Sequence, residues 1–188
     1  MKTLLVLLSS ALLLAGCGGD ALVRDDAAGA YVGLTGAEVR LIVPVKVAAG
    51  KARVFIQGGD VPRNRNPYTG GGFNQYRPHC AFEIRSVDHD GVIIEPDTFR
   101  IVRTQESLQE VVQAPGRQFA GLGLMIGSGV WGGGASYHLG YHFTLYSERQ
   151  PDVMRMSCYG VYAERYDLYA PTVGEIRAAL RGVAEIHR

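Results

Sequence analysis

The stretch that decides the fold is EVRLIVPVKV, residues 38–47. Apolar side chains recur there at every second position, which is the spacing of a strand with one buried face. Because proline cannot donate a ladder hydrogen bond, Pro44 predicts that this strand lies at a sheet edge or is bulged. A turn at 49–51 and a strand at 53–57 would complete a hairpin. The alternating residues are Val39, Leu41, Val43, Val45 and Val47.

Further strands follow with the same spacing. In the segment 80–87, Cys80, Phe82 and Ile84 share one face, and Glu83 and Arg85 share the other. The sequence Asp88-His89-Asp90-Gly91 has the composition of a turn and not of a metal loop, which needs more oxygen ligands at regular spacing. Further candidate strands are 92–94, 99–103, 141–145 and 154–158.

The end of the chain predicts a helix over 172–187. Thr172 and Glu175 have the spacing of a capping box, in which each side chain bonds the backbone amide of the other. An apolar stripe with helical spacing follows. Many short strands and one helix predict a mainly β fold, a sandwich or small barrel of antiparallel strands with a C-terminal amphipathic helix. The stripe comprises Val173, Ile176, Leu180, Val183 and His187.

The N-terminus predicts export. Lys2 precedes an apolar run over 4–14, and small residues close it. Such a run is too short to span a bilayer and is typical of a secretory signal peptide, here residues 1–16. The segment 17–36 is rich in Gly, Ala and Asp, which predicts a flexible tether. A single β-rich domain would then occupy 37–188.

The sequence Leu14-Ala15-Gly16-Cys17 resembles the lipobox of bacterial lipoproteins. The resemblance implies that Cys17 receives a diacylglycerol, that cleavage precedes it and that the tether begins with an acylated cysteine. Several fatty acyl chains, palmitate for example, would anchor the protein in a membrane. In a Gram-negative host, Gly18 implies the outer membrane, with the domain facing the periplasm. The resemblance covers the export segment alone, and we recognise no family for 37–188.

Two cysteines remain once Cys17 is assigned to the lipid. An even number of cysteines in an exported protein predicts a disulfide, here Cys80–Cys158. The alternative is two separate buried thiols. The bridge would tie an early strand to a late one.

Charge excludes one class of partner. Without residues 1–16 the chain carries 18 acidic residues and an equal number of basic ones. This balance gives no electrostatic footprint for nucleic acid.

No motif predicts a cofactor, a metal or a catalytic centre. His138 and His142 have the spacing of a helical zinc pair, but on a strand they would stand roughly 13 Å apart. His79 could join them only through the fold. Ser128 lies directly between two glycines, whereas the esterase elbow has its glycines two positions away.

Two irregular segments are candidate contact surfaces. Loops as long as 58–79 are uncommon unless they are functional or disordered, and this one is rich in arginine and aromatic residues, which dominate binding hot spots. The segment 118–147 carries no charged residue, and its glycine-rich first part, 118–137, would expose apolar side chains. The candidate partner-binding residues are Arg63, Arg65, Tyr68, Phe73, Tyr76, Met125 and Trp131.

These observations favour a binding or assembly component of the cell envelope, joined to the membrane through its lipid anchor and able to bind an envelope protein. The alternative is a periplasm-facing hydrolase or small-molecule-binding lipoprotein whose site forms only in three dimensions. A purely structural role is the third possibility. An enzyme is the less favoured class, because no catalytic motif is present.

Overall fold

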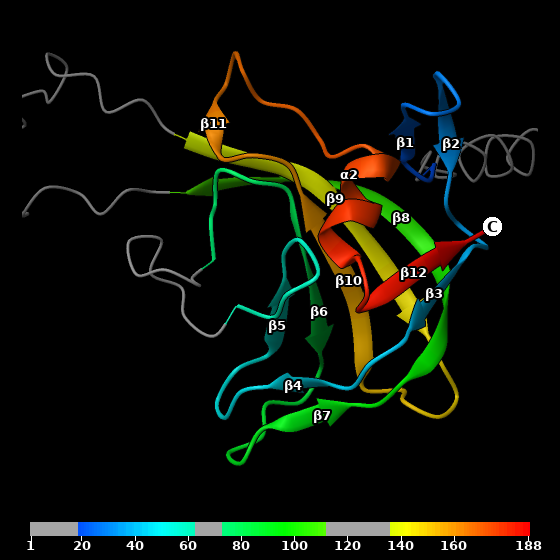
Figure 1. Ribbon diagram of the computed structural model, residues 1–188, viewed down its shortest axis with the longest axis vertical. Helices are drawn as coiled ribbons and strands as arrows, with labels where there is room; N and C mark the ends of the chain where they lie inside the picture. Colours follow the sequence, from blue (N-terminus) through cyan, green and yellow to red (C-terminus); the bar gives the residue numbers. More distant parts are fainter. Residues whose placement is uncertain (1–18, 63–72, 112–135) are drawn as a thin grey trace, which may run out of the picture.

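The computed structural model describes residues 19–62, 73–111 and 136–188, and Figure 1 shows that antiparallel strands dominate it. Most of these strands belong to one curled sheet. They are β3 (Glu38–Leu41), β5 (Arg53–Ile56), β6 (His79–Ile84), β8 (Asp97–Val111), β9 (Ser136–Tyr146), β10 (Val153–Tyr159), β11 (Ala163–Glu164) and β12 (Ala184–His187).

The order of the strands in this sheet is β12-β3-β8-β9-β10-β6-β5, and β11 pairs with β9 off this path. Two smaller sheets complete the described part of the fold: β1 (Leu22–Asp25) with β2 (Ala30–Gly33), and β4 (Val45–Val47) with β7 (Val92–Ile94). The main sheet curls into a half-barrel, and one helix, α2 (Val173–Leu180), lies near the C-terminus. The predicted mainly β fold class is therefore confirmed.

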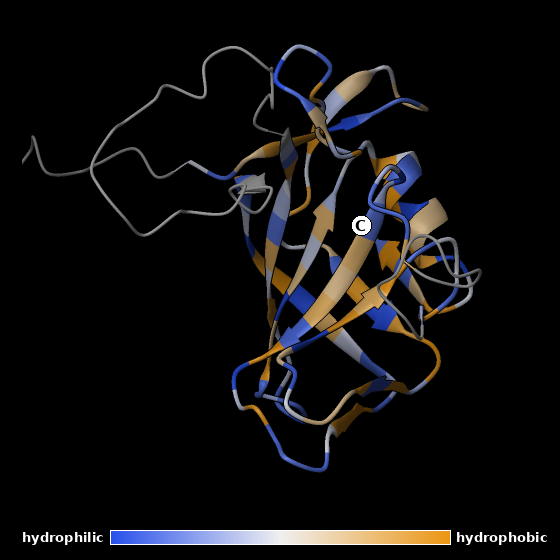
Figure 2. Ribbon diagram, turned by 90° about the vertical axis from the view of Figure 1, so that its left-hand side faces the viewer, coloured by the Kyte–Doolittle hydropathy of each residue, from blue (hydrophilic) through white to orange (hydrophobic). Residues whose placement is uncertain are grey.

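The hydrophobic core lies between one face of the curled sheet, here called the inner face, and α2. Phe82, Phe99 and Phe143 from three strands are fully buried there, together with Ile176 and Leu180 of the helix. Burial of each such side chain contributes about 1.5–3 kcal/mol to stability. Figure 2 shows the resulting alternation of apolar and polar residues along the strands. The opposite face, here called the outer face, carries polar side chains and aromatic rings.

The predicted flexible tether at 17–36 is wrong from Leu22 onward. This segment forms the β1–β2 hairpin, whose turn is set by Gly29 at φ 62° and by a hydrogen bond from the Ala27 amide to the Asp25 carboxylate. Val23 and Leu34 lie fully buried in the core, so the domain begins before residue 37. The alternation in β1 is only four residues long, which is why the glycine- and alanine-rich composition concealed it.

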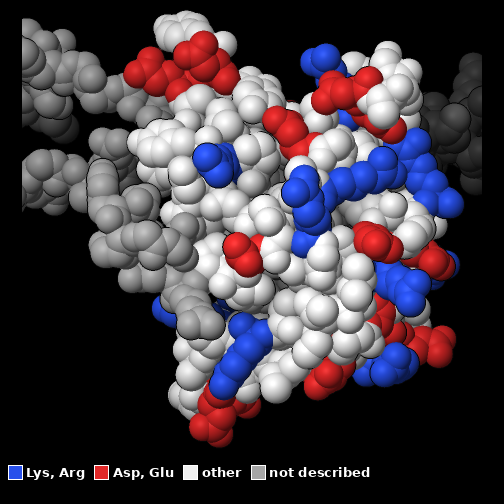
Figure 3. Space-filling model, in the orientation of Figure 1, with Lys and Arg blue, Asp and Glu red and all other residues white. Residues whose placement is uncertain are grey.

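Charges of both signs meet at this hairpin. Arg24 Nε lies 3.1 Å from the Asp26 carboxylate, and Arg188 Nη2 lies 3.0 Å from the Asp25 carboxylate. Figure 3 shows basic and acidic side chains intermixed at this end of the molecule. The hairpin therefore presents no field of a single sign.

Pro44 divides the predicted strand at 38–47 into two. β3 ends at Leu41 and pairs with β8 and β12, whereas β4 begins at Val45 and pairs with β7. The chain thus changes sheets at the residue that cannot donate a ladder hydrogen bond. The predicted hairpin between 38–47 and 53–57 is wrong, because β5 pairs with β6 and not with β4.

The helix begins as predicted but ends early. The Glu175 amide donates to Thr172 Oγ1 at 3.2 Å, and the Thr172 amide donates to the Glu175 carboxylate at 2.9 Å, so the capping box is present. The predicted extent to 187 is wrong, since α2 ends at Leu180 and Gly182 turns the chain at φ 73°. Ala184 and Ile186 are then buried alternately in β12, whereas His187, the last residue of the predicted helical stripe, is exposed.

The disulfide Cys80–Cys158 is present, with its Cα atoms 4.0 Å apart, and the alternative of two separate thiols is wrong. Cys80 and Cys158 face each other directly across β6 and β10. The bond therefore joins neighbouring strands from the two halves of the chain. It also fixes which residues of β6 lie opposite which residues of β10.

Among the residues that the structure describes, no helix combines the length and apolar character needed to cross a bilayer.

Removing the disulfide should lower the free energy of unfolding. For a bond across a sequence separation of 78 residues, loop-closure entropy in the chain-entropy model gives about 4 to 5 kcal/mol. In urea denaturation at pH 7.5, Cys80→Ala/Cys158→Ala should unfold at a lower midpoint than the oxidised wild type. Reductant should lower the wild-type midpoint and leave that of the double variant unchanged. Equal midpoints for oxidised and reduced wild type would contradict this expectation.

Candidate functional site

Three strands place histidine and tyrosine side chains together on the outer face. Because Cys80 lies opposite Cys158, the preceding His79 lies opposite Tyr159, and Tyr159 in turn lies opposite Gly140 of β9. His138, two positions before Gly140, points to the same face. We call the resulting cluster of rings the histidine–aromatic face. It comprises Phe55, Phe73, Tyr76, His79, His138, His142, Tyr159 and Tyr162.

The rings of this face contact one another in a continuous series. Ring centroids lie 4.5 Å apart for Phe73 and His79, 5.4 Å for His79 and His138, and 5.2 Å for His138 and Tyr162. Tyr76 meets Tyr162 edge-on at 5.7 Å and is itself 60% exposed. Such arrangements favour the edge of one ring against the face of the next. The series runs from buried histidines to an exposed tyrosine.

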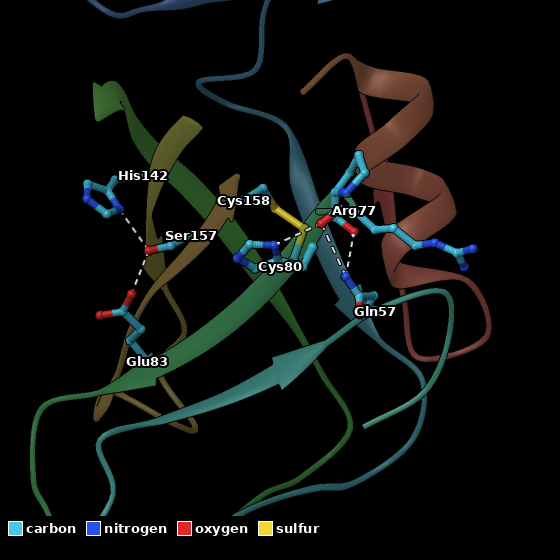
Figure 4. The surroundings of a disulfide bond; sticks show 9 residues. Gln57, Arg77, Cys80, Glu83, His142, Ser157 and Cys158 are labelled. Atoms are coloured by element: carbon cyan, nitrogen blue, oxygen red, sulfur yellow. Dashed lines mark hydrogen bonds between the residues drawn. A yellow bond between two sulfur atoms is a disulfide. The ribbon is translucent and has the colours of Figure 1, made fainter. Parts of the chain in front are cut away.

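Gln57 fixes the loop that supplies Phe73 and Tyr76. Its amide nitrogen donates to the Arg77 carbonyl at 3.2 Å (Figure 4). The same nitrogen donates to the Asn74 carbonyl at 2.7 Å, and the amide oxygen accepts from the Asn74 amide at 2.8 Å. The Arg77 carbonyl also contacts His79 Nδ1 at 3.1 Å. One glutamine therefore holds the loop in a defined position beside the sheet.

A buried carboxylate, Glu83, lies beside the rings on the same face and is paired with two partly exposed arginines. Arg155 donates two hydrogen bonds to Glu83, from Nε at 3.0 Å and from Nη2 at 2.8 Å, and Arg53 lies 4.0 Å away. Burial by itself would raise the pKa of Glu83, but the bonds from Arg155 and Ser157 and the two arginine charges together lower it below its ordinary value. Glu83 is therefore a carboxylate at neutral pH.

Hydrogen bonds connect this carboxylate to the rings in one direction. Ser157 Oγ donates to Glu83 at 2.6 Å, so it accepts from His142 Nδ1 at 2.7 Å (Figure 4). Burial is the main cause that lowers the pKa of His142, so its ring is neutral at pH 7 and its Nε2 is an acceptor. Tyr159 then donates to Nε2 at 3.4 Å, and Ser107 can donate to Tyr159 at 3.4 Å.

His79 and His138 are held neutral inside the cluster. Burial lowers the pKa of His79 from 6.5 to about 4, with a smaller contribution from His138. Burial likewise lowers the pKa of His138, a residue that is 8% exposed. Within the described residues, Nδ1 of His138 is buried without a hydrogen-bond partner. A charge on either ring would therefore be costly.

This geometry does not fit a serine nucleophile. In a catalytic triad the histidine accepts the serine proton and the acid orients the histidine. Here the Ser157 hydroxyl donates its hydrogen bond to Glu83, the serine is fully buried, and His142 donates a hydrogen bond to the serine instead of accepting one from it. The structure does gather histidines and a carboxylate on one face, as the alternative hydrolase function requires. They are bound to one another, however, and not arranged around an exposed hydroxyl.

Metal binding finds no support in the described part of the chain, where no group of three or more His, Cys, Asp and Glu side chains could hold an ion. The turn predicted at Asp88-His89-Asp90 is present, with the Asp90 amide donating to the Asp88 carboxylate at 2.6 Å. Glycine follows at φ 84°.

Of the predicted partner-binding residues, Phe73 and Tyr76 belong to the histidine–aromatic face. The other five lie outside the described residues, and so does the predicted lipidation site Cys17. The five partner-binding residues outside the described part of the chain are Arg63, Arg65, Tyr68, Met125 and Trp131.

Neither the contact between His79 and His138 nor the place of Tyr159 in this cluster was predicted from the sequence. The available signal was the cysteine pair, because its register alone brings His79 opposite Tyr159.

The chain matches no protein-family model, no curated protein and no solved structure.

Replacing Gly140 should destabilise the fold, because this glycine makes room for Tyr159. A Cβ atom at Gly140 would collide with the Cys158 carbonyl oxygen and lie 2.6 Å from the Tyr159 ring. Overpacking of this kind costs about 1 to 3 kcal/mol, so the urea midpoint of Gly140→Ala should fall. The control is Gly174→Ala in α2, where the nearest atom lies 3.8 Å away and alanine should stabilise by up to about 1 kcal/mol. Equal midpoints for the two variants would contradict the packing argument.

Stability should fall in acid because of His79. A base whose pKa is lowered to about 4 in the folded state binds a proton more readily when unfolded. The stabilisation is therefore complete above the unfolded pKa of 6.5 and is lost as the pH falls toward 4; at pH 4.5 the loss is about 2.5 kcal/mol. Urea denaturation between pH 7.5 and 4.5 measures it.

The comparison that isolates this contribution is between two variants. His79→Phe keeps a ring in the cluster but cannot titrate, so its stability should depend less on pH than that of the wild type. His89→Gln removes an exposed histidine in a turn and should retain the wild-type dependence. A pH dependence unchanged in His79→Phe would refute the assignment.

Proposed function

We propose that the protein is a lipid-anchored envelope lipoprotein that faces the periplasm from the outer membrane and binds another envelope component through the histidine–aromatic face. The signal-peptide pattern and the lipobox around Cys17 support the anchor and the location. The cross-strand disulfide agrees with them, since disulfides persist in oxidising compartments such as the periplasm.

One observation carries the binding role: a continuous series of rings that ends in an exposed tyrosine. Tyr76 is 60% exposed, and it rests on Tyr162, which contacts buried His138. Tyrosine offers a rigid apolar ring with a polar tip, which is why it is frequent in binding hot spots. The rings beneath Tyr76 hold it in place, so little conformational entropy is lost when a partner covers it.

The chemistry of this face favours an uncharged partner segment. The buried histidines are neutral above pH 6.5, and the nearby arginines Arg53 and Arg155 are directed at Glu83. Among the described residues of this face, the group most open to a partner is Tyr76, with its exposed ring and hydroxyl group, since Tyr159 and Tyr162 are buried. A peptide segment with apolar or aromatic side chains suits this surface better than a phosphate or a nucleic acid.

Hydrolysis has weaker support than binding. Its case depends on Glu83, Ser157 and His142 lying within hydrogen-bonding distance of one another. The fully buried Ser157 hydroxyl keeps its proton and donates a hydrogen bond to the carboxylate, and no histidine among the described residues is placed to accept that proton during an attack, so the serine is not an activated nucleophile.

Crosslinking in intact Gram-negative cells should test the binding role. A photoreactive residue at Tyr76 should crosslink a single envelope protein, whereas one at Val87, which is 56% exposed, should not. The mass of the purified wild type should include acyl chains that Cys17→Ser lacks. An unacylated Cys17 would contradict the anchor. Acylated protein that crosslinks no better through Tyr76 than through Val87 would contradict the binding role.

A further inference from the structure

The N-terminal segment of the chain is hydrogen-bonded to the main sheet from Asp20 onward, only three residues after Cys17. The Thr104 amide donates to the Asp20 carboxylate at 3.2 Å, and the Ala21 amide donates to the Thr104 carbonyl at 2.9 Å. A fully extended chain spans at most about 3.6 Å per residue, so a lipid anchor three residues before Asp20 could hold that residue no farther than about 11 Å from the acylated position. If Cys17 carries the lipid anchor, this end of the domain is held at the bilayer surface.

The β1–β2 hairpin begins directly after this attachment. Leu22 lies opposite Gly33 and Arg24 lies opposite Tyr31, so Leu22, Arg24 and Tyr31 share one face of the small sheet. Leu22 is 54% exposed and Tyr31 is 67% exposed, and the Arg24 side chain is 65% exposed. An aliphatic, an aromatic and a basic side chain therefore stand side by side in solvent.

The orientation of this face relative to the rest of the domain is fixed. On the other side of the hairpin Val23 is fully buried in the core, and Asp25 accepts a hydrogen bond from Arg188 at 3.0 Å. The Tyr141 hydroxyl donates to the Leu22 carbonyl at 3.3 Å. The hairpin cannot turn its exposed side chains inward without breaking these contacts.

We propose that the exposed face of the β1–β2 hairpin, formed by Leu22, Arg24 and Tyr31, lies on the lipid bilayer that holds the Cys17 anchor and sets the orientation of the domain on it. The inference rests on the proposed lipidation. Tyrosine is enriched at membrane interfaces, and arginine can extend its charge to the headgroups while its stem packs on apolar surface.

Lipid headgroups of no net charge fit this face. The Arg24 charge is paired with Asp26 at 3.1 Å, and the turn after it carries only small uncharged residues, Ala27, Ala28 and Gly29. The contact is therefore apolar and interfacial, with no strong Coulombic attraction to anionic lipid. A second copy of the chain or another protein on this face is the competing occupant that the experiment must exclude.

The test uses quenching of tryptophan by brominated lipid in the acylated full-length protein. Trp131→Phe removes the single tryptophan, and Tyr31→Trp or Ile93→Trp introduces a new one. Ile93 is 53% exposed and belongs to β7, a strand that lies at the opposite end of the molecule from β1 and β2 (Figure 1). The proteins are reconstituted in phosphatidylcholine vesicles brominated at carbons near the headgroup. Tyr31→Trp should be quenched at least threefold more than Ile93→Trp, independently of the protein-to-lipid ratio.

Two other outcomes would overturn the inference. Equal quenching at the two positions would place the hairpin away from the lipid. The second outcome is a tryptophan emission at position 31 that is blue-shifted but not quenched and that changes with the density of protein in the membrane. It would place another copy of the chain on this face. The acyl mass of Cys17 is measured on the same sample. Failure of the docking in acylated protein is thereby distinguished from failure of the lipidation itself.

Discussion

The disulfide between Cys80 and Cys158 fixes the register on which the rest of the structure depends. With Cys80 opposite Cys158, Phe82 and Met156 enter the core, while His79 and Tyr159 lie on the outer face. A shift of one residue between β6 and β10 would reverse the faces of one strand relative to the other. Glu83 would then lose Ser157 and Arg155, and a buried carboxylate without these partners is costly. Core and candidate site therefore depend on the same covalent constraint.

Local chemistry explains which parts of the fold the sequence could predict. The alternating burial in β3 and β4, the presence of a strand at β5 and the capping box of α2 are properties of adjacent residues, and they were predicted correctly. Val43, between β3 and β4, was expected in the same buried series and is exposed. Partner choice is not local, and for that reason the hairpin between residues 38–47 and β5 was wrong. The fifteen-residue strand β8 was mostly missed because Thr104 and Glu106 occupy positions where a regular pattern would have apolar residues.

Most of the candidate site could not be predicted from the sequence, for the same physical reason. His79 and His138 meet only because β10 lies between their strands, an arrangement that no spacing in the sequence encodes. The neutral state of these histidines is likewise a consequence of burial by residues distant in the chain. Composition did identify Phe73 and Tyr76, since aromatic residues in a long irregular segment are unusual. The series of hydrogen bonds that runs from Tyr159 through His142 and Ser157 to Glu83 had no counterpart in the sequence pattern.

The two proposed surfaces are related through a single strand, β9. Tyr141 points to the inner face and bonds the backbone of Leu22 in the hairpin, whereas the next residue, His142, points to the outer face and bonds Ser157. With a long flexible tether, the histidine–aromatic face could take any orientation relative to the membrane. If Cys17 carries the anchor, attachment of the chain to the sheet at Asp20 removes that freedom, because only two residues, Gly18 and Gly19, lie between them. A hairpin on the bilayer would then leave the opposite face of the sheet accessible to a partner in the periplasm.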